Sequence, residues 1–411
     1  MTFTLYANRI RLALVPLLMS VLFSSELQAS PDLSQRDVAS ALTSHALKNR
    51  FPNKLKFRSQ KTQQDVTGYI QYTFDEKIHQ DMADVYLRYQ PDYACFVAID
   101  VETGAIINLT SFIKSDEQWD NLVMRSDYPA ASVFKMVSAA AGLDLGKVSP
   151  STVIPFNGKS TTLYKSQVLR HKDNKWTRTP TFKESFAKSV NPVFGRLGVF
   201  QLGAGNITKY AQRFGFGQKL TTDFELPPSE LRLDLETEWE LAEAASGFTK
   251  DITLSPIHAA QIAAIVANDG KMVVPYMVES IRSKNGKELY TSSPLKQSTQ
   301  VISSSTAQQM RTLMKETTRI GSARKSFGGL SRYSVYKNME IGGKTGSLTG
   351  FSPRGRHDWF VGYAEKNNRK VAYASLIINK EKWYVRSAYV ARQFIYNFFS
   401  EPKESPELAK N

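Results

Sequence analysis

The sequence predicts an α/β chain of the α+β-like type, with an antiparallel sheet built from early and late strands, flanked by helices and carrying a helical subdomain. Two strand-like runs near the start, Tyr93–Ile99 and Ala105–Leu109, are joined by a turn that contains a Thr-Gly pair. Two more, residues 357–364 and 370–379, lie near the end and flank a short polar turn. Helix-like runs fill the middle of the chain, so we expect one sheet assembled from both ends.

Four helical segments are expected. Residues 132–145 follow a proline and contain a nearly unbroken apolar run, which is typical of a buried helix. Residues 181–198 and 236–268 also have helical character, and Asn268–Gly270 is a stop signal for the second of them. Residues 385–399 are amphipathic and are expected to form a closing helix.

Composition supports a globular chain with a sizeable core. Hydrophobic residues make up 42% of the 411 residues and charged residues 22%, which excludes a wholly disordered, collagenous or polytopic membrane protein. The single cysteine, Cys95, permits no internal disulfide and is interpreted as a core residue because it lies in a predicted buried strand. The five histidines are scattered, so no metal is expected, and no cofactor is expected either.

The first 29 residues have the three parts of a secretory signal peptide. Arg9 and Arg11 form a basic start, Leu12–Phe23 is an apolar run, and the polar stretch after it ends on Ala29. The apolar run is shorter than the roughly 20 residues that a spanning helix needs. We therefore expect residues 1–29 to be a signal peptide for export to the periplasm, with an uncleaved inner-membrane anchor as the alternative.

The rest of the chain is expected to comprise a basic N-terminal approach segment (residues 30–65), a main domain (66–399) and a flexible C-terminal tail (400–411). The net charge is +15, and residues 48–61 contain six basic residues and no acidic one. Such a run is either a solvated face or a contact with an anionic membrane or cell-wall polymer. Export favours an envelope polymer or anionic lipid over nucleic acid as a partner, so nucleic acid is not expected.

A serine and a lysine one helical turn apart are the first candidates for catalysis. The pattern Ser-x-x-Lys occurs seven times, and a lysine at position i+3 of a helix can take the serine's proton if burial lowers its pKa. Only Ser132 and Lys135 begin a predicted buried helix without neighbouring charge. The other matches, which begin at residues 111, 185, 293, 322, 334 and 400, lie in loops, a basic stretch, an ordinary helix or the tail.

Two further motifs follow in a fixed order. Ser189-Val190-Asn191 lies 57 residues after Ser132, and Lys344-Thr345-Gly346, followed by Ser347, begins 155 residues after Ser189. Glycines around this lysine are expected in a strand whose backbone approaches a ligand closely. Each motif is common by itself, but the ordered set of three in suitable contexts is not.

These three motifs resemble those of the transpeptidase domain of penicillin-binding proteins, which shares them with serine β-lactamases. The resemblance covers residues 66–399, and one local departure is Pro129-Ala130-Ala131-Ser132, where the family often has Pro-Gly-Ser. It implies the penicillin-binding transpeptidase fold for residues 66–399. Further similar stretches are residues 72–75, 98–106, 254–259, 267–270, 321–323 and 358–363.

The resemblance implies a role for each matched residue of the first two motifs. Ser132 would attack the carbonyl between two D-alanines and form an acyl-enzyme, and Lys135 would act as its base. Ser189 would relay the proton to the leaving amine. Asn191 would hold both the acyl side chain of the substrate and Lys135.

The third motif would bind the end of the substrate. Lys344 and Thr345 would bind the terminal carboxylate, Gly346 would keep the strand surface bare, and the backbone N–H groups of Ser132 and Ser347 would form the oxyanion hole. The expected function is a periplasmic D,D-transpeptidase, or D,D-carboxypeptidase, acting on peptidoglycan stem peptides and inhibited by β-lactams. The alternatives are a serine β-lactamase and a noncatalytic β-lactam sensor or envelope scaffold.

Overall fold

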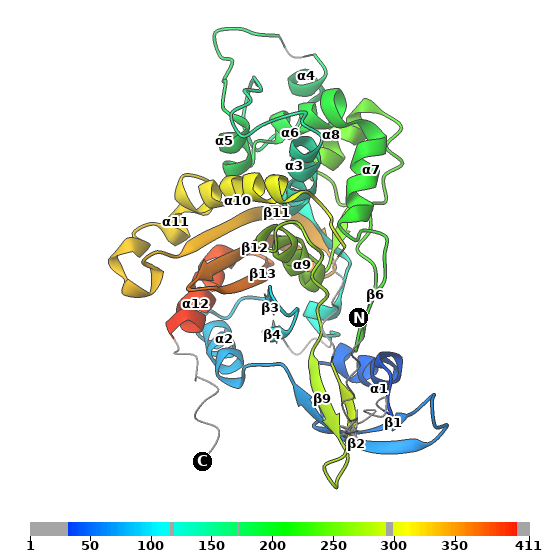
Figure 1. Ribbon diagram of the computed structural model, residues 1–411. Coiled ribbons are helices and arrows are strands. Elements are labelled where there is room, and N and C mark those ends of the chain that lie inside the picture. Colours follow the sequence, from blue (N-terminus) through cyan, green and yellow to red (C-terminus); the bar gives the residue numbers. More distant parts are fainter. Residues whose placement is uncertain (1–31, 116–118, 171, 293–298, 401–411) are drawn as a thin grey trace, which may run out of the picture.

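The computed structural model describes residues 32–115, 119–170, 172–292 and 299–400 (Figure 1). The predicted signal peptide and residues 401–411 of the predicted tail lie outside the described residues. None of the helices in the described ranges combines the length and the apolar character needed to span a membrane.

A five-stranded antiparallel sheet lies at the centre of the molecule, and the expectation of a sheet built from both ends of the chain is confirmed. The strand order is β11-β12-β13-β3-β4, so that β11 is an edge strand. The early strands pair with the late ones through β3 and β13. The bounds are β3 Tyr93–Asp100, β4 Ile106–Ile113, β11 Glu340–Phe351, β12 Arg354–Lys366 and β13 Arg369–Asn379.

Helices cover both faces of this sheet (Figure 1). On β3, Cys95 and Val97 belong to the core beneath α9 and α10, whereas Phe96 and Ala98 belong to a second core beneath α2 and α12. Alternate residues of a strand point to opposite faces, so a strand covered on both sides is apolar throughout. The prediction that Cys95 is a core residue is thereby confirmed. These helices are α2 Glu76–Tyr89, α9 Pro256–Ala267, α10 Ser304–Arg319 and α12 Ser387–Ser400.

The middle of the chain forms the expected helical subdomain, which lies at the top of Figure 1. The predicted helix 132–145 begins as a 3₁₀ turn, Ala131–Phe134, and continues as α3. The helices of the subdomain are α3 Lys135–Asp144, α4 Lys165–Val168, α5 Phe182–Ala187, α6 Asn191–Leu197, α7 Gly203–Arg213 and α8 Glu238–Ser246.

Two predicted helices are each divided in two. The expected helix 181–198 breaks between α5 and α6, where Ser189 has a φ of 56°. The expected helix 236–268 ends at Gly247, whose φ of 61° is the left-handed conformation typical of a residue after a helix. A new helix then begins where the Ser255 side chain accepts the N–H of His258 and a proline follows in the first turn. The single-helix expectations were wrong because these stop and start signals outweigh the apolar spacing.

Residues 32–65 are a folded part of the molecule. Helix α1 (Gln35–Leu47), β1 (Lys54–Arg58) and β2 (Asp65–Tyr72) lie here, and the boundary expected at residue 66 falls inside β2. The strands continue into a second antiparallel sheet of order β1-β2-β9-β10, whose other members are β9 (Val278–Arg282) and β10 (Glu288–Thr291). Three short elements complete the connections: the β5–β8 pair (Tyr128–Pro129 with Thr253–Leu254), the β6–β7 pair (Leu220–Thr221 with Glu225–Leu226) and α11 (Arg324–Phe327).

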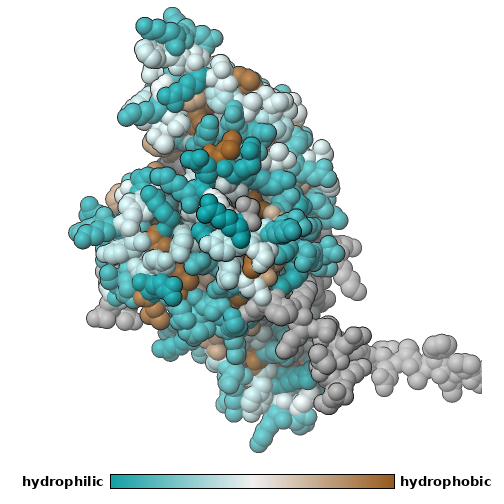
Figure 2. Space-filling model, turned by 90° about the vertical axis from the view of Figure 1, so that its left-hand side faces the viewer, coloured by the Kyte–Doolittle hydropathy of each residue, from teal (hydrophilic) through white to brown (hydrophobic). Residues whose placement is uncertain are grey.

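The face of the molecule seen in Figure 2 is mostly hydrophilic, with scattered small apolar patches. This distribution is consistent with most large apolar side chains lying in the cores on the two sides of the central sheet.

We expect a buried histidine to make the fold sensitive to acid. Burial lowers the pKa of His258 to about 4, and its Nε2 lies 2.7 Å from the carbonyl oxygen of Phe214. An unfolded histidine titrates near 6.5, so the free energy of unfolding should fall as the pH drops from 6.5 to 4. Because of this one histidine, the free energy of unfolding should be about 2 kcal/mol lower at pH 5 than at pH 7.5.

Urea unfolding of wild type and His258→Gln at pH 7.5 and pH 5 measures this contribution. The glutamine amide can still donate to Phe214 but does not titrate, so the variant should lose about 2 kcal/mol less stability than wild type over this range. The matched control is His45→Gln, which removes a partly exposed histidine in the last turn of α1. An equal acid response in wild type and His258→Gln would contradict the expectation.

Candidate active site

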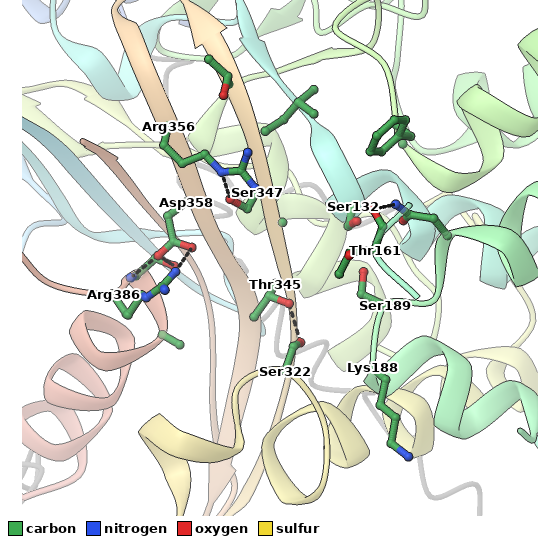
Figure 3. Close-up of a pocket in the computed structure, with 18 of the residues that line it drawn as sticks. Ser132, Thr161, Lys188, Ser189, Ser322, Thr345, Ser347, Arg356, Asp358 and Arg386 are labelled. Atoms are coloured by element: carbon green, nitrogen blue, oxygen red, sulfur yellow. Dashed lines mark hydrogen bonds and ion pairs between the residues drawn. The ribbon is translucent and has the colours of Figure 1, made fainter. Parts of the chain in front are cut away.

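A pocket of about 530 Å³ lies between the helical subdomain and the edge strand β11. Ser132 and Ser189 line one wall, and Thr345 and Ser347 line the opposite wall (Figure 3). The pocket therefore brings together residues of all three sequence motifs.

Lys135 lies completely buried behind Ser132. Its Nζ is 2.8 Å from Ser132 Oγ, 2.7 Å from Asn191 Oδ1 and 2.5 Å from the carbonyl oxygen of Ser246. Burial, and to a smaller extent the charge of Lys344, lowers the pKa of Lys135 well below its ordinary value. Burial therefore favours the neutral amine over the charged ammonium.

The contacts of this amine also fix its orientation. The side-chain oxygen of Asn191 can only accept, because the amide nitrogen donates to the carbonyl of Thr161 at 3.0 Å. The carbonyl of Ser246 is likewise an acceptor. As an ammonium, Lys135 donates to all three oxygens. A neutral amine would donate its two N–H bonds to Asn191 and Ser246 and could accept the hydroxyl hydrogen of Ser132 with its lone pair. The arrangement can remove a proton from that hydroxyl.

Ser189 lies at the break between α5 and α6. Its positive φ interrupts the helix, and its side chain lines the pocket near Ser132 in Figure 3. Asn191, two residues later, is the first residue of α6 and is 6% exposed. The break thus places a hydroxyl in the pocket and an amide beside Lys135.

Strand β11 carries the third motif. The Oγ1 of Thr345 lies 2.5 Å from the Oγ of Ser322. A Cβ on Gly346 would lie 3.0 Å from Val133 Cγ2 and 3.3 Å from Val133 N. The strand therefore lies directly against the turn that holds Ser132, and a larger residue than glycine would push the two apart.

Lys344 lies behind the pocket wall and does not line the pocket. It is completely buried, and its Nζ donates to the carbonyl of Thr345 at 2.9 Å. Burial lowers its pKa to about 7. The expected carboxylate contact of Lys344 stays a prediction, and in this geometry the lysine would act on a ligand through its charge.

The turn that carries Ser132 rests on the C-terminal end of α8. A Cβ on Gly247 would lie 2.0 Å from the carbonyl oxygen of Ala131 and 3.3 Å from the backbone nitrogen of Ser132. Ala131 itself has a φ of 49°, which explains why a glycine suits this position in similar sequences. From the sheet side, Trp359 Nε1 donates to the carbonyl of Pro129 at 3.0 Å.

Sequence reasoning missed the charged residues of the pocket. Five cationic side chains line it, and Asp358 is the one acidic residue among the described lining residues. Lys188 could have been found because it precedes Ser189, but no local pattern marks the others. The cations are Lys188, Lys250, Lys325, Arg356 and Arg386.

Comparison with known proteins identifies a family. Residues 94–398 match the family model described as the penicillin binding protein transpeptidase domain. The chain is 27% identical over 293 residues to stage V sporulation protein D of Bacillus subtilis, covering 68% of this chain and 44% of that protein. It is 28% identical over 268 residues to the peptidoglycan D,D-transpeptidase PbpA of Mycolicibacterium smegmatis, covering 62% and 51%. The chain thus spans about half the length of these relatives.

A solved structure confirms the fold. The penicillin G acyl-enzyme complex of penicillin-binding protein A from Mycobacterium tuberculosis has a TM-score of 0.62 with this chain. Sequence identity is 23%, and the match covers 80% of each chain. The predicted penicillin-binding transpeptidase fold is therefore correct.

The contact between Gly247 and the Ser132 turn can be tested by stability measurements. We expect Gly247→Ala to be strongly destabilising, because its Cβ would collide with the backbone of Ala131. Gly146→Ala is the matched control, since Gly146 has a similar φ of 64° but no atom within 4 Å of its Cβ. The control should lose only about 1 kcal/mol from backbone strain.

Urea unfolding of both variants measures the difference in their free energies of unfolding. Hydrogen exchange of the Ala131 and Ser132 amides shows whether the turn before Ser132 becomes less protected. Exchange at these amides should be faster in Gly247→Ala than in Gly146→Ala. Equal losses of stability in the two variants would show that the contact does not constrain the turn.

Proposed function

The chain belongs to the penicillin-binding protein transpeptidase family, and we propose that it is a serine D,D-transpeptidase that cross-links peptidoglycan stem peptides ending in D-Ala-D-Ala. The observation that carries the proposal is the buried Lys135 amine, 2.8 Å from the hydroxyl of Ser132 in a pocket. The relative from Mycolicibacterium smegmatis is named as an enzyme of this type, which supports the proposal.

In the first half-reaction, Ser132 Oγ attacks the carbonyl carbon of the penultimate D-alanine while Lys135 takes the hydroxyl proton. The oxygen of that carbonyl gains negative charge, and the backbone N–H groups of Ser132 and Ser347 are proposed to stabilise it. Collapse of the intermediate breaks the peptide bond. Ser189 relays a proton to the departing D-alanine amine, and an ester on Ser132 remains.

In the second half-reaction an amine of a neighbouring stem peptide attacks this ester and regenerates Ser132. Water would give the D,D-carboxypeptidase reaction instead. In this proposal the side chains and backbone N–H groups of the chain carry out the chemistry. A β-lactam reacts by the same first step, and the solved penicillin G acyl-enzyme of a similarly folded protein supports this expectation.

The terminal carboxylate of the substrate is proposed to lie against Thr345, Gly346 and Ser347 on β11. Thr345 supplies a hydroxyl that already contacts Ser322, and Gly346 leaves the strand surface bare. The edge position of β11 allows an extended peptide to lie beside it. Lys344 adds positive charge beneath the strand, and Asn191 holds the acyl side chain of the substrate.

We propose that the protein works in the periplasm. The N-terminal pattern of residues 1–29 and the cell-wall substrate support this location. We also propose that the basic residues 48–61 contact an anionic component of the envelope, either lipid or cell-wall polymer.

Fluorescent penicillin labelling of the full chain tests the nucleophile and its base. We expect no label on Ser132→Ala, and labelling of Lys135→Ala should be about 10²–10⁴-fold slower because general-base help is lost. The matched control is Ser185→Ala, which alters another Ser-x-x-Lys match on α5. Ser185 is completely buried and does not line the pocket, so its loss should leave the labelling rate nearly unchanged.

The persistence of the label separates the alternatives. A label stable over hours agrees with a transpeptidase, and D-alanine release from a D-Ala-D-Ala pentapeptide then distinguishes an enzyme from a sensor. Rapid loss of the label would instead identify a β-lactamase. Label on Ser132→Ala would overturn the assignment of the nucleophile.

Lys344 should make acylation depend on pH. Its pKa of about 7 means that it loses its charge as the pH rises through 7. The second-order acylation rate with a free-acid β-lactam, which reports the free enzyme, should therefore decline above pH 7. The methyl ester of the same β-lactam has no carboxylate and should not show this decline.

Stopped-flow acylation from pH 6 to pH 9 with both compounds measures the effect in wild type and Lys344→Gln. In Lys344→Gln, the acylation rates with the acid and with the ester should depend on pH in the same way. Thr345→Val removes a neutral hydroxyl, so it should lower the rate with the acid by about 10- to 150-fold without abolishing the decline. A decline of equal size with the ester would rule out a carboxylate-directed role for Lys344.

A further inference from the structure

The far wall of the pocket carries two arginines that the proposed reaction does not use. Arg356 lies on β12, and Arg386 immediately precedes α12. Both line the pocket with Asp358 between them, on the side away from Ser132 (Figure 3).

The guanidinium of Arg356 is held in place but keeps free donors. Its Nε donates to Ser347 Oγ at 2.7 Å, and its two terminal nitrogens make no hydrogen bond to any residue that the structure describes. Ser347 itself lies on the wall proposed to receive the substrate. A fixed guanidinium with two outward nitrogens is suited to binding a carboxylate with both of its oxygens.

Arg386 is oriented by a different contact. Its guanidinium carbon lies 3.7 Å from the centroid of the Trp383 ring, and its Nη1 is 3.7 Å from Asp358 Oδ1. The other oxygen of Asp358 accepts the backbone N–H and the hydroxyl of Ser387, each at 3.0 Å. Asp358 is therefore occupied by the start of α12 and cannot neutralise both arginines.

The charge of the whole pocket exceeds what one carboxylate needs. Five cations and one acid line it, whereas a peptide ending in D-Ala-D-Ala brings a single terminal carboxylate. An excess of one sign in a cleft selects ligands of the opposite sign. The far wall holds two of the five cations and the one acid, and it lies apart from the place proposed for the terminal carboxylate on β11. Its remaining positive charge is suited to a further negative group on the ligand.

We propose that Arg356 and Arg386 form a subsite for a second carboxylate, so that the enzyme selects stem peptides whose side-chain carboxylate is free over peptides in which it is amidated. This inference rests on the proposed function. The carboxylate belongs either to the donor peptide that acylates Ser132 or to the acceptor peptide that resolves the ester. The chemistry of recognition is the same in both.

Equilibrium binding tests the subsite without requiring turnover. The probes are two D-Ala-D-Ala pentapeptides that differ only in a free or an amidated side-chain carboxylate at the third residue, and the corresponding pair of acceptor peptides without the last two residues. The protein is the full chain with Ser132→Ala, and titration calorimetry gives the dissociation constants. We expect the acid form of one pair to bind about tenfold more tightly than its amide.

Two variants and one control test whether the two arginines cause the preference for the acid form of the peptide. Adding Arg386→Gln or Arg356→Gln should reduce the preference for the acid to about twofold or less. Adding Lys188→Gln removes an equal charge from the opposite wall, so it should weaken both forms by the same factor. A preference in the donor pair or in the acceptor pair supports the subsite and identifies whose carboxylate it binds.

Other results would overturn the proposal. Equal affinity for acid and amide in both pairs, or equal losses for both forms in the arginine variants, would show that the arginines are ordinary solvated cations. Fluorescent penicillin labelling of wild type separates this failure from failure of the proposed function. A chain that labels at Ser132 but does not discriminate the peptides keeps its proposed activity and lacks the subsite.

Discussion

The site depends on removing one amine from water. Lys135 is fully buried, and its Nζ contacts a hydroxyl, an amide oxygen and a backbone carbonyl that come from three separate segments of the chain. An isolated ammonium would be costly in such a place. The surrounding fold supplies acceptors that satisfy a neutral amine, and in doing so it aligns the amine with Ser132.

The rest of the architecture holds these segments together. The end of α8 provides Ser246 for the lysine and supports the turn before Ser132, and the start of α6 provides Asn191. The sheet supplies the opposite wall, because its edge strand lies against the same turn and Trp359 anchors the preceding residues. The helical subdomain and the sheet therefore meet at Ser132.

Much of this arrangement could be predicted from the sequence because it rests on local patterns. The alternation of apolar residues in the strands, the Ser-x-x-Lys pair on a helix and the Lys-Thr-Gly strand each have a short-range signature. What could not be predicted depends on contacts between distant segments. Examples are the position of Lys344 behind the pocket wall and the gathering of Arg356 and Arg386 beside Asp358. The two divided helices could have been predicted in part. Gly247 is a helix stop signal in the sequence, but the continuous apolar spacing was given more weight.

Gly247 lines the pocket and contacts the turn before Ser132, whereas no residue of α8 itself lines the pocket. The packing of α8 can therefore influence Ser132 from outside the pocket. The carbonyl of Ala131 leaves no room for movement of the end of α8 toward it, so a change in how α8 packs would be transmitted to Ser132 through the backbone. If the proposed acylation at Ser132 takes place, substitutions in this helix would change its rate without changing any group that lines the pocket. With the proposed reactivity toward β-lactams, variants of reduced sensitivity would then be expected in α8 as well as in the pocket, and a map limited to ligand contacts would overlook them.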